Sequence, residues 1–96
     1  MRVKNINGTS GNICKCGSWL KHWEKFSRQS LPPYCSEKTC MKKPEVGAHV
    51  QKDNSTDNSW YIVPLCNVHN GETGKSIDIM DSTVLVSANV SETCGK

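Results

Sequence analysis

The sequence predicts a small α+β domain, with one N-terminal helix, short antiparallel strands and an apolar core too small to hold the fold alone. A chain of 96 residues is long enough for one core, so we expect residues 1–96 to form a single domain. Leu, Ile, Val and Phe together number only 18. Folding costs roughly 1–2 kcal/mol of backbone entropy per residue, and core-poor domains offset it with metal ions or disulfides. Six cysteines are available for either.

The start of the chain indicates which of the two the cysteines form. Residues 1–8 contain no apolar run of the length that a secretory signal needs, so we expect a cytoplasmic protein. No stretch approaches 18 apolar residues, so we expect no membrane span. Disulfides do not persist in a reducing compartment, and the cysteines are therefore predicted to bind metal.

The first third of the chain predicts one strand and one helix. Residues 2–6 alternate weakly and are expected to form a short edge strand. Cys14 to Gly17 is expected to make a tight turn. Ser18 is a typical N-cap for a helix that runs to about Gln29. The helix is expected to turn one face to the core through Trp19, Trp23 and Phe26.

The rest of the chain predicts a hairpin, a short helix and two further strands. β-Branched and aromatic residues mark the strands, and the polar stretch 53–59 is typical of a hairpin tip. In chain order the predicted elements are the strand Val46–Val50, the strand Trp60–Val63 closed by Pro64, a helix from Cys66 to about Lys75, and the strands Ile77–Ile79 and Thr83–Ala88.

The predicted metal site lies at the two ends of this hairpin. Cys35 and Cys40 form one closely spaced pair before it, and Cys66 and His69 form a second pair after it. Zinc takes four tetrahedral ligands at about 2.0–2.3 Å, and a gap of two to four residues lets one turn present two of them. Two such turns fill every coordination position, so the sequence predicts a structural zinc ion.

A second metal site is a weaker possibility. Its ligands would be Cys14, Cys16, His22 and Cys94, because Cys14 and Cys16 form a compact chelating pair. Two alternatives stay open. Either these cysteines are free thiols, or Cys14 or Cys16 replaces one of the ligands of the first site.

The charge of the chain permits contact with nucleic acid without requiring it. The formal net charge is +3, from 12 basic and 9 acidic residues. Two loose groups of cations lie on the predicted helix and around Cys40. Taken alone, each is typical of a solvated surface; they are Lys21, Lys25 and Arg28, and Lys38, Lys42 and Lys43.

The hairpin and its flanking ligands resemble the HNH endonucleases, the ββα-metal nucleases. The residues that carry the resemblance are the Cys35 and Cys40 pair, Gly47-Ala48-His49-Val50, and Ile62-Val63-Pro64-Leu65-Cys66-x2-His69-Asn70. The resemblance spans Cys35 to about Lys75. It implies a treble-clef fold around the zinc ion.

In that family the first-strand His is the general base, and the residue after the last zinc ligand binds the catalytic Mg²⁺ or Mn²⁺. The resemblance assigns these roles to His49 and Asn70. Two features depart from the family pattern. Tyr61 stands where the family has its middle Asn, and Ala48 precedes His49, so few carboxylates are near to hold magnesium.

These departures favour a zinc-binding module that is not catalytic and that binds nucleic acid or a protein partner. Two alternatives stay open. One is an active metal-dependent nuclease that uses His49 and Asn70. The other is a structural protein that offers its tryptophans to a protein partner; these are Trp19, Trp23 and Trp60. The sequence does not indicate an oligomeric state.

Overall fold

The computed structural model describes residues 1–6, 17–53, 56–71 and 74–89, which form one antiparallel sheet and two helices. The predicted α+β class is confirmed for this part of the chain. The sheet has five strands in the order β4-β1-β2-β3-β5. The strands are β1 (Arg2–Asn5), β2 (Val46–Lys52), β3 (Tyr61–Leu65), β4 (Ser76–Asp78) and β5 (Val86–Ser87), and the helices are α1 (Trp19–Ser27) and α2 (Asn67–Asn70).

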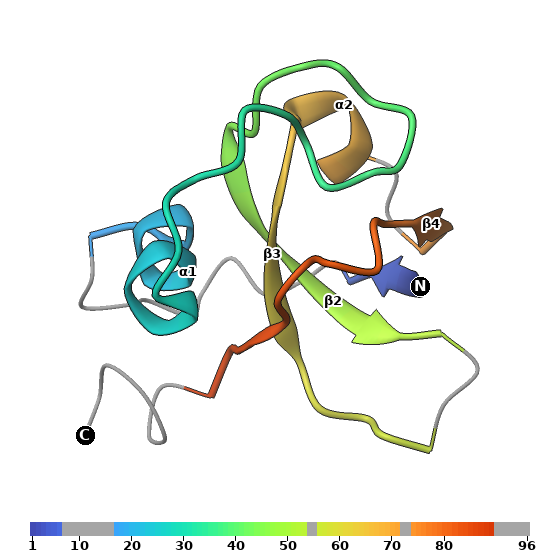
Figure 1. Cartoon of the computed structure of the whole chain (residues 1–96). Coiled ribbons are helices and arrows are strands. Elements are labelled where there is room, and N and C mark those ends of the chain that lie inside the picture. The colour runs from blue at the N-terminus through green and yellow to red at the C-terminus, as the bar shows by residue number, and fades with distance from the viewer. Residues whose placement is uncertain (7–16, 54–55, 72–73, 90–96) are drawn as a thin grey trace.

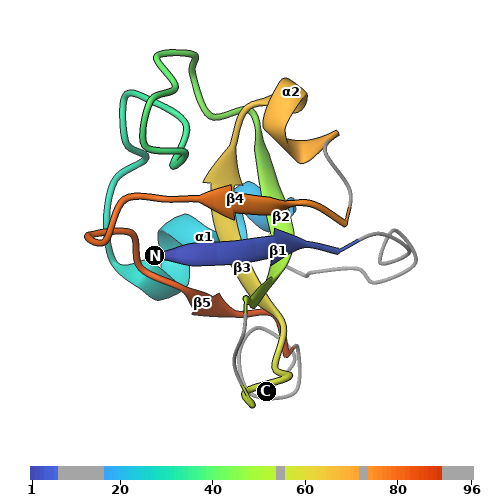
Figure 2. The same ribbon diagram turned by 90° about the vertical axis from the view of Figure 1, so that its right-hand side faces the viewer.

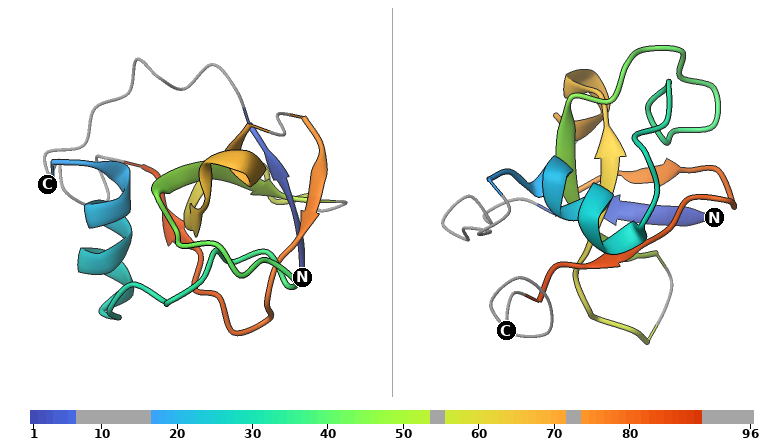
Figure 3. Two further views of the ribbon diagram at one scale, coloured as in Figure 1. Left: turned by 90° about the horizontal axis from the view of Figure 1, so that it is seen from above. Right: turned by 60° about the vertical axis from the view of Figure 1, so that its left-hand side comes forward.

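The β2–β3 hairpin stands at the centre of the molecule (Figure 1). In Figure 2, β1 and β4 run across the hairpin in front of it, because the sheet is strongly twisted. Helix α1 flanks the hairpin on the side away from β4, as the two views of Figure 3 show. Helix α2 follows directly on β3, so the second predicted ligand pair lies at one end of the hairpin.

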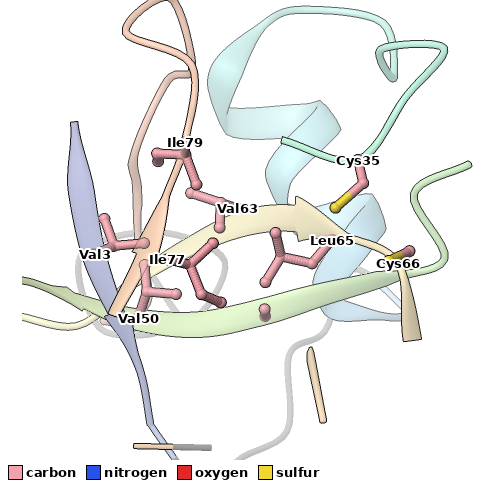
Figure 4. Close-up of a cluster of buried hydrophobic side chains, with 9 residues drawn as sticks. Val3, Cys35, Val50, Val63, Leu65, Cys66, Ile77 and Ile79 are labelled. Atoms are coloured by element: carbon pink, nitrogen blue, oxygen red, sulfur yellow. The ribbon is translucent and has the colours of Figure 1, made fainter. Parts of the chain in front are cut away.

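Two apolar clusters cover the two faces of the hairpin. The larger one joins β1 and β4 to the hairpin and to the segment around Cys35 (Figure 4); its buried members are Val3, Cys35, Ala48, Val50, Val63, Leu65, Cys66, Ile77 and Ile79. The smaller cluster lies under α1 and contains Trp23, Ile62 and Val86. Because both faces are covered, residues 62–65 of β3 are buried without alternation.

Helix α1 begins where the sequence predicts. The Ser18 side chain accepts a hydrogen bond from the Lys21 N–H at 3.1 Å, so Ser18 is the N-cap. The helix ends at Ser27, before the predicted Gln29, because Arg28 takes a left-handed conformation with φ 60°. Of the three predicted core residues, Trp23 is buried, while Trp19 and Phe26 are half-buried and pack against the smaller cluster.

One predicted strand position and two predicted strand limits are wrong. β1 is an interior strand instead of an edge, because β4 pairs with its other side. Pro64 does not close β3, which runs on to Leu65, since a proline φ suits an extended strand and only one N–H is lost. The predicted strand Thr83–Ala88 shrinks to Val86–Ser87, the two residues that pair with β3.

The short helix predicted after Cys66 is present. α2 is a single turn that ends at Asn70, and the Gly71 N–H bonds to the Asn67 carbonyl at 3.0 Å. Gly74 takes φ 78°, which turns the chain toward β4.

Candidate metal centre

The structure brings the four predicted ligands of the first site together. The sulfur atoms of Cys35, Cys40 and Cys66 and a ring nitrogen of His69 all lie within 4.8 Å of one another. Cys35 and Cys66 are buried, and the other two are half-buried. Figure 4 shows the sulfurs of Cys35 and Cys66 at the end of the larger apolar cluster.

Main-chain hydrogen bonds fix the turn that carries the first pair. The Cys35 N–H bonds to the Lys42 carbonyl at 2.7 Å, and the Cys40 N–H bonds to the Glu37 carbonyl at 3.1 Å. Ser36, which follows Cys35, donates a hydrogen bond from its main-chain N–H to the Pro64 carbonyl at 3.0 Å. The turn is therefore attached to the end of β3, directly before the second ligand pair.

Cys66 and His69 face the same point because of their places in α2. Cys66 is the N-cap residue, and His69 lies three residues later, which is about one turn of helix. The Asn70 N–H closes this turn on the Cys66 carbonyl at 3.0 Å. Glu45 accepts hydrogen bonds from the main chain and side chain of Asn67 at 3.4 and 3.1 Å, which anchors the start of α2.

Three of the distances between the ligand atoms are close to those around a tetrahedral ion. Zinc–sulfur bonds of about 2.3 Å and zinc–nitrogen bonds of about 2.0 Å place neighbouring ligand atoms roughly 3.5–3.8 Å apart. The Cys40 and Cys66 sulfurs are 3.8 Å apart. The His69 Nδ1 atom lies 3.7 Å from the Cys35 sulfur and 3.2 Å from the Cys66 sulfur. All three cysteines are free, and the 3.8 Å separation is far beyond a disulfide bond of about 2.05 Å.

Burial and hydrogen bonding act in opposite directions on the thiol pKa values. Burial raises the pKa of the Cys35 thiol to about 12. Burial works in the same direction on Cys66, but hydrogen bonds from the main chain and ring of His69 and from the Cys40 thiol outweigh it and lower the pKa to about 7. A divalent metal favours the thiolate form of every ligand, because it supplies the opposite charge inside the site.

Glu37 orients the histidine ligand. One carboxylate oxygen of Glu37 lies 3.5 Å from the His69 Nε2 atom, on the side of the ring away from the sulfurs. The Thr39 N–H and hydroxyl hold that carboxylate at 3.1 and 2.9 Å. A carboxylate behind a metal-bound imidazole fixes the ring and raises its basicity. Sequence reasoning missed Glu37, although a carboxylate between the first two ligands was a visible signal.

The centre has no free coordination position. Four protein ligands complete a tetrahedron, so neither water nor substrate has a place on the ion. The residues present therefore fit a structural metal, and their sulfur-rich chemistry favours zinc over magnesium or calcium.

The two residues that the resemblance assigns to catalysis are not among the four candidate ligands of this centre. His49 is only 7% exposed, and its ring packs edge-on against Trp19 at 4.6 Å between centroids. Its Nε2 atom has no hydrogen-bond partner among the described residues. Burial, and then the charge of His22, lower its pKa, so the ring is neutral at pH 7.

Asn70 is half-buried at the end of α2, and its main-chain carbonyl accepts a hydrogen bond from the Asn5 side chain at 2.5 Å. It lines a pocket together with Glu45, Gly47 and Trp19. His49 is not among the described residues that line this pocket. The predicted base and the predicted metal ligand therefore do not face one shared pocket in this arrangement.

Tyr61, which stands where the family has its middle Asn, has a structural contact of its own. Its hydroxyl donates to Asp57 at 2.5 Å, across the loop at the hairpin tip. This hydrogen bond raises the pKa of Tyr61 and lowers that of Asp57. The hydrogen bond from Tyr61 to Asp57 therefore connects the start of β3 to the hairpin loop and stabilises that loop.

Of the four predicted ligands of the second metal site, the structure describes only His22. His22 is fully buried in α1, and its Nε2 atom donates to the Ser87 carbonyl at 2.9 Å. The other three predicted ligands lie outside the described residues; they are Cys14, Cys16 and Cys94. The second site stays a prediction.

In comparisons with protein-family models, curated proteins and solved structures, no family model matches the chain, and neither search finds a significant match. Across the described ranges, no helix is both long and apolar enough to cross a bilayer. Function is therefore inferred from the chain's own residues.

Proposed function

We propose that this chain is a zinc-stabilised module that binds nucleic acid without cleaving it, on a treble-clef frame similar to that of the HNH nucleases. The observation that carries the binding function is the distribution of charge. Ten of the 12 Lys and Arg residues lie in the described part of the chain; Lys15 and Lys96 are the exceptions. All ten are exposed. Lys38 and Lys52 alone among them take part in described ion pairs.

The described acidic residues, by contrast, are mostly engaged within the fold. Six of them hold hydrogen bonds or ion pairs with protein groups: Glu37, Glu45, Asp53, Asp57, Asp78 and Asp81. The described residues therefore include ten cations, all of them exposed, against seven acids, in line with the net charge of +3, and hydrogen bonds to neutral groups leave those acids charged. Such a surface attracts a polyanion by releasing its counterions.

The burial of His49 supports the absence of catalysis. A general base must come within about 3 Å of the water that it activates beside a phosphodiester. The Trp19 ring covers His49, and the closed metal centre offers no coordination site.

The three described cysteines are free thiols, which fits a reducing compartment such as the cytoplasm.

One observation favours the competing function of a nuclease. The lowered pKa of His49 keeps its ring neutral at pH 7, which is the form that a general base requires. If the chain is a nuclease, Mg²⁺ or Mn²⁺ would bind at Asn70 and movement of α1 would expose His49. A protein-binding function has weaker support, because Trp23 is buried and Trp60 is the only tryptophan of the described part that counts as exposed.

One set of measurements tests the proposal. Metal analysis of purified protein is expected to give one zinc per chain if the first site alone is occupied. A gel-shift titration with duplex DNA is expected to show binding that weakens as salt rises. Plasmid incubated with Mg²⁺ or Mn²⁺ is expected to stay intact. Cleavage that disappears in His49→Ala would establish the nuclease alternative, and absence of binding at low salt would refute the proposed function.

A further inference from the structure

Two lysines lie on one face of α1, and an arginine follows at its C-terminal end. Lys21 and Lys25 are four residues apart, so the 3.6-residue period places them on one side of the helix. Arg28 is the C-cap residue, in a left-handed conformation with φ 60°, directly after the last helical residue. All three are exposed. None of them takes part in an ion pair described by the structure. We call these three residues the α1 ridge.

The opposite face of α1 is fixed rigidly to the sheet. Trp23 is 2% exposed, and its indole N–H donates to the Val84 carbonyl at 2.8 Å. The helix main chain lies directly on Gly47 of β2, where an added Cβ atom would be 2.4 Å from the carbonyl carbon of Trp19. In Figures 1 and 3, α1 stands at the edge of the molecule, outside the hairpin. The ridge is therefore held in place on an outward-facing helix.

The described residues of α1 provide little negative charge to balance the ridge. Like charges four residues apart disfavour a helix, and Lys21 and Lys25 have this spacing. The first turn of α1 contains no acidic residue. Glu24 is the one acid on the helix, and it is half-buried. An anion from outside the chain is the natural partner of this row of charges.

We infer that the α1 ridge is the surface that contacts the phosphate backbone of duplex DNA; this inference rests on the proposed nucleic-acid binding. From Lys21 to Arg28 the chain advances by seven residues, which corresponds to about 10 Å along the helix axis. Duplex DNA carries one negative charge per roughly 1.7 Å of its axis, so several phosphates lie within reach of the three cations.

The aromatic residues of α1 favour a duplex over a single strand. Single-strand binders stack bases on exposed aromatic rings. Trp19, Trp23 and Phe26 instead pack toward the sheet, in and around the smaller apolar cluster. Contacts to phosphates alone carry no base information, so binding through the ridge is independent of sequence.

Two triple variants of equal charge test the location. Lys21→Gln/Lys25→Gln/Arg28→Gln removes the ridge, and glutamine keeps the helix because its helix propensity is close to that of lysine. The control, Arg2→Gln/Lys4→Gln/Lys75→Gln, removes three cations that are equally exposed and free of described ion pairs, on or next to β1 and β4. Metal content and circular dichroism confirm that both variants are folded.

Fluorescence anisotropy with a labelled duplex of about 20 base pairs, between about 50 and 200 mM salt, gives the readout. The ridge variant is expected to bind at least about tenfold more weakly at the lowest salt. The magnitude of its slope of log affinity against log salt concentration is expected to fall by about 2 to 3, since each phosphate contact contributes about 0.9. The control is expected to change the affinity less than about threefold.

Three results separate the possible failures. Equal weakening in both variants would show that only net charge matters and would overturn the assignment to α1. Tighter binding of a single strand of the same length would overturn the choice of a duplex. A wild-type chain that binds neither oligonucleotide at low salt would refute the proposed function itself, and the inference with it.

Discussion

The two flanks of the central hairpin are held by different forces. At one end, the Cys35 turn and the single turn of α2 meet through four ligand atoms within 4.8 Å. Along one side, α1 is held by Trp23 and its neighbours in the smaller apolar cluster. The metal end has little secondary structure of its own, whereas the α1 side is a capped helix. If the four residues hold a metal ion, coordination adds to the packing of Cys35 and Cys66 at this end, and we expect the two flanks to unfold separately.

The largest effect is expected from loss of a metal ligand. Cys35→Ser replaces a buried thiolate with a poor zinc ligand, and structural zinc binding contributes about 10–16 kcal/mol to folding in zinc-finger peptides. We expect less than one zinc per chain and loss of cooperative thermal unfolding. Mass spectrometry of the metal and circular dichroism measure these outcomes.

Met41→Ala is the matched control for this turn. Met41 is 76% exposed, so its truncation is expected to change stability by less than about 0.5 kcal/mol. A Cys35→Ser protein that keeps its zinc and its melting temperature would show that the metal end does not depend on coordination.

The next largest effect is expected at the α1 side. Trp23→Ala removes a buried indole and its hydrogen bond to the Val84 carbonyl, which typically costs about 3–5 kcal/mol. If the flanks are independent, the variant still binds one zinc per chain under conditions in which it is folded. Chemical denaturation gives the stability, and metal analysis gives the stoichiometry. Loss of zinc at low denaturant would indicate that the two flanks unfold together.

The same contrast explains what the sequence predicted well. Cys35, Cys40, Cys66 and His69 were found because each pair is local and a hairpin separates the pairs. The Ser18 cap was found for the same reason, since its partner Lys21 is three residues away. Local spacing specifies these features, and their geometry follows once the hairpin closes.

Long-range contacts account for what the sequence did not predict. The coverage of His49 by Trp19 joins residues 30 positions apart. It depends on Gly47, whose missing side chain lets the helix main chain approach β2. The pairing of β4 with β1, which makes β1 an interior strand, joins residues 72 to 76 positions apart. No pattern within a short window contains this information.

A smaller effect is expected at the carboxylate behind the metal ligand. Glu37→Gln keeps the size of the side chain but removes the charge that faces His69 Nε2. Such partners typically account for a 10- to 100-fold change in metal affinity. Competition with a coloured zinc chelator measures the change. Thr39→Val, which removes a hydroxyl contact of Glu37, is expected to lie between this variant and the wild type, and unchanged affinity in both would show that Glu37 does not support the ion.

The smallest effect is the pH dependence of α1 docking. The pKa of His49 is lowered below its usual 6.5 by burial and by the charge of His22. The unfolded chain therefore binds a proton at His49 more readily than the folded chain does, so this residue's contribution to stability is full above pH 6.5 and is lost as pH falls below that value. His49 contacts α1, Ile6 directly after β1, Trp60 directly before β3, and Ile62 of β3. His22 on α1 is the titratable group whose charge acts on it, and the described contacts outside α1 come from these three uncharged residues.

His49→Gln isolates this contribution from any loss of metal in acid. Wild type and variant share the same four candidate ligands, so the pH dependence of metal binding is common to both. The free energy of unfolding, measured by denaturant titration at pH 7.5 and near pH 5.5 with zinc content checked at each, is expected to fall more in the wild type than in the variant. Equal losses would mean that His49 does not couple α1 to pH, and that the acid sensitivity of the chain belongs to the metal end alone.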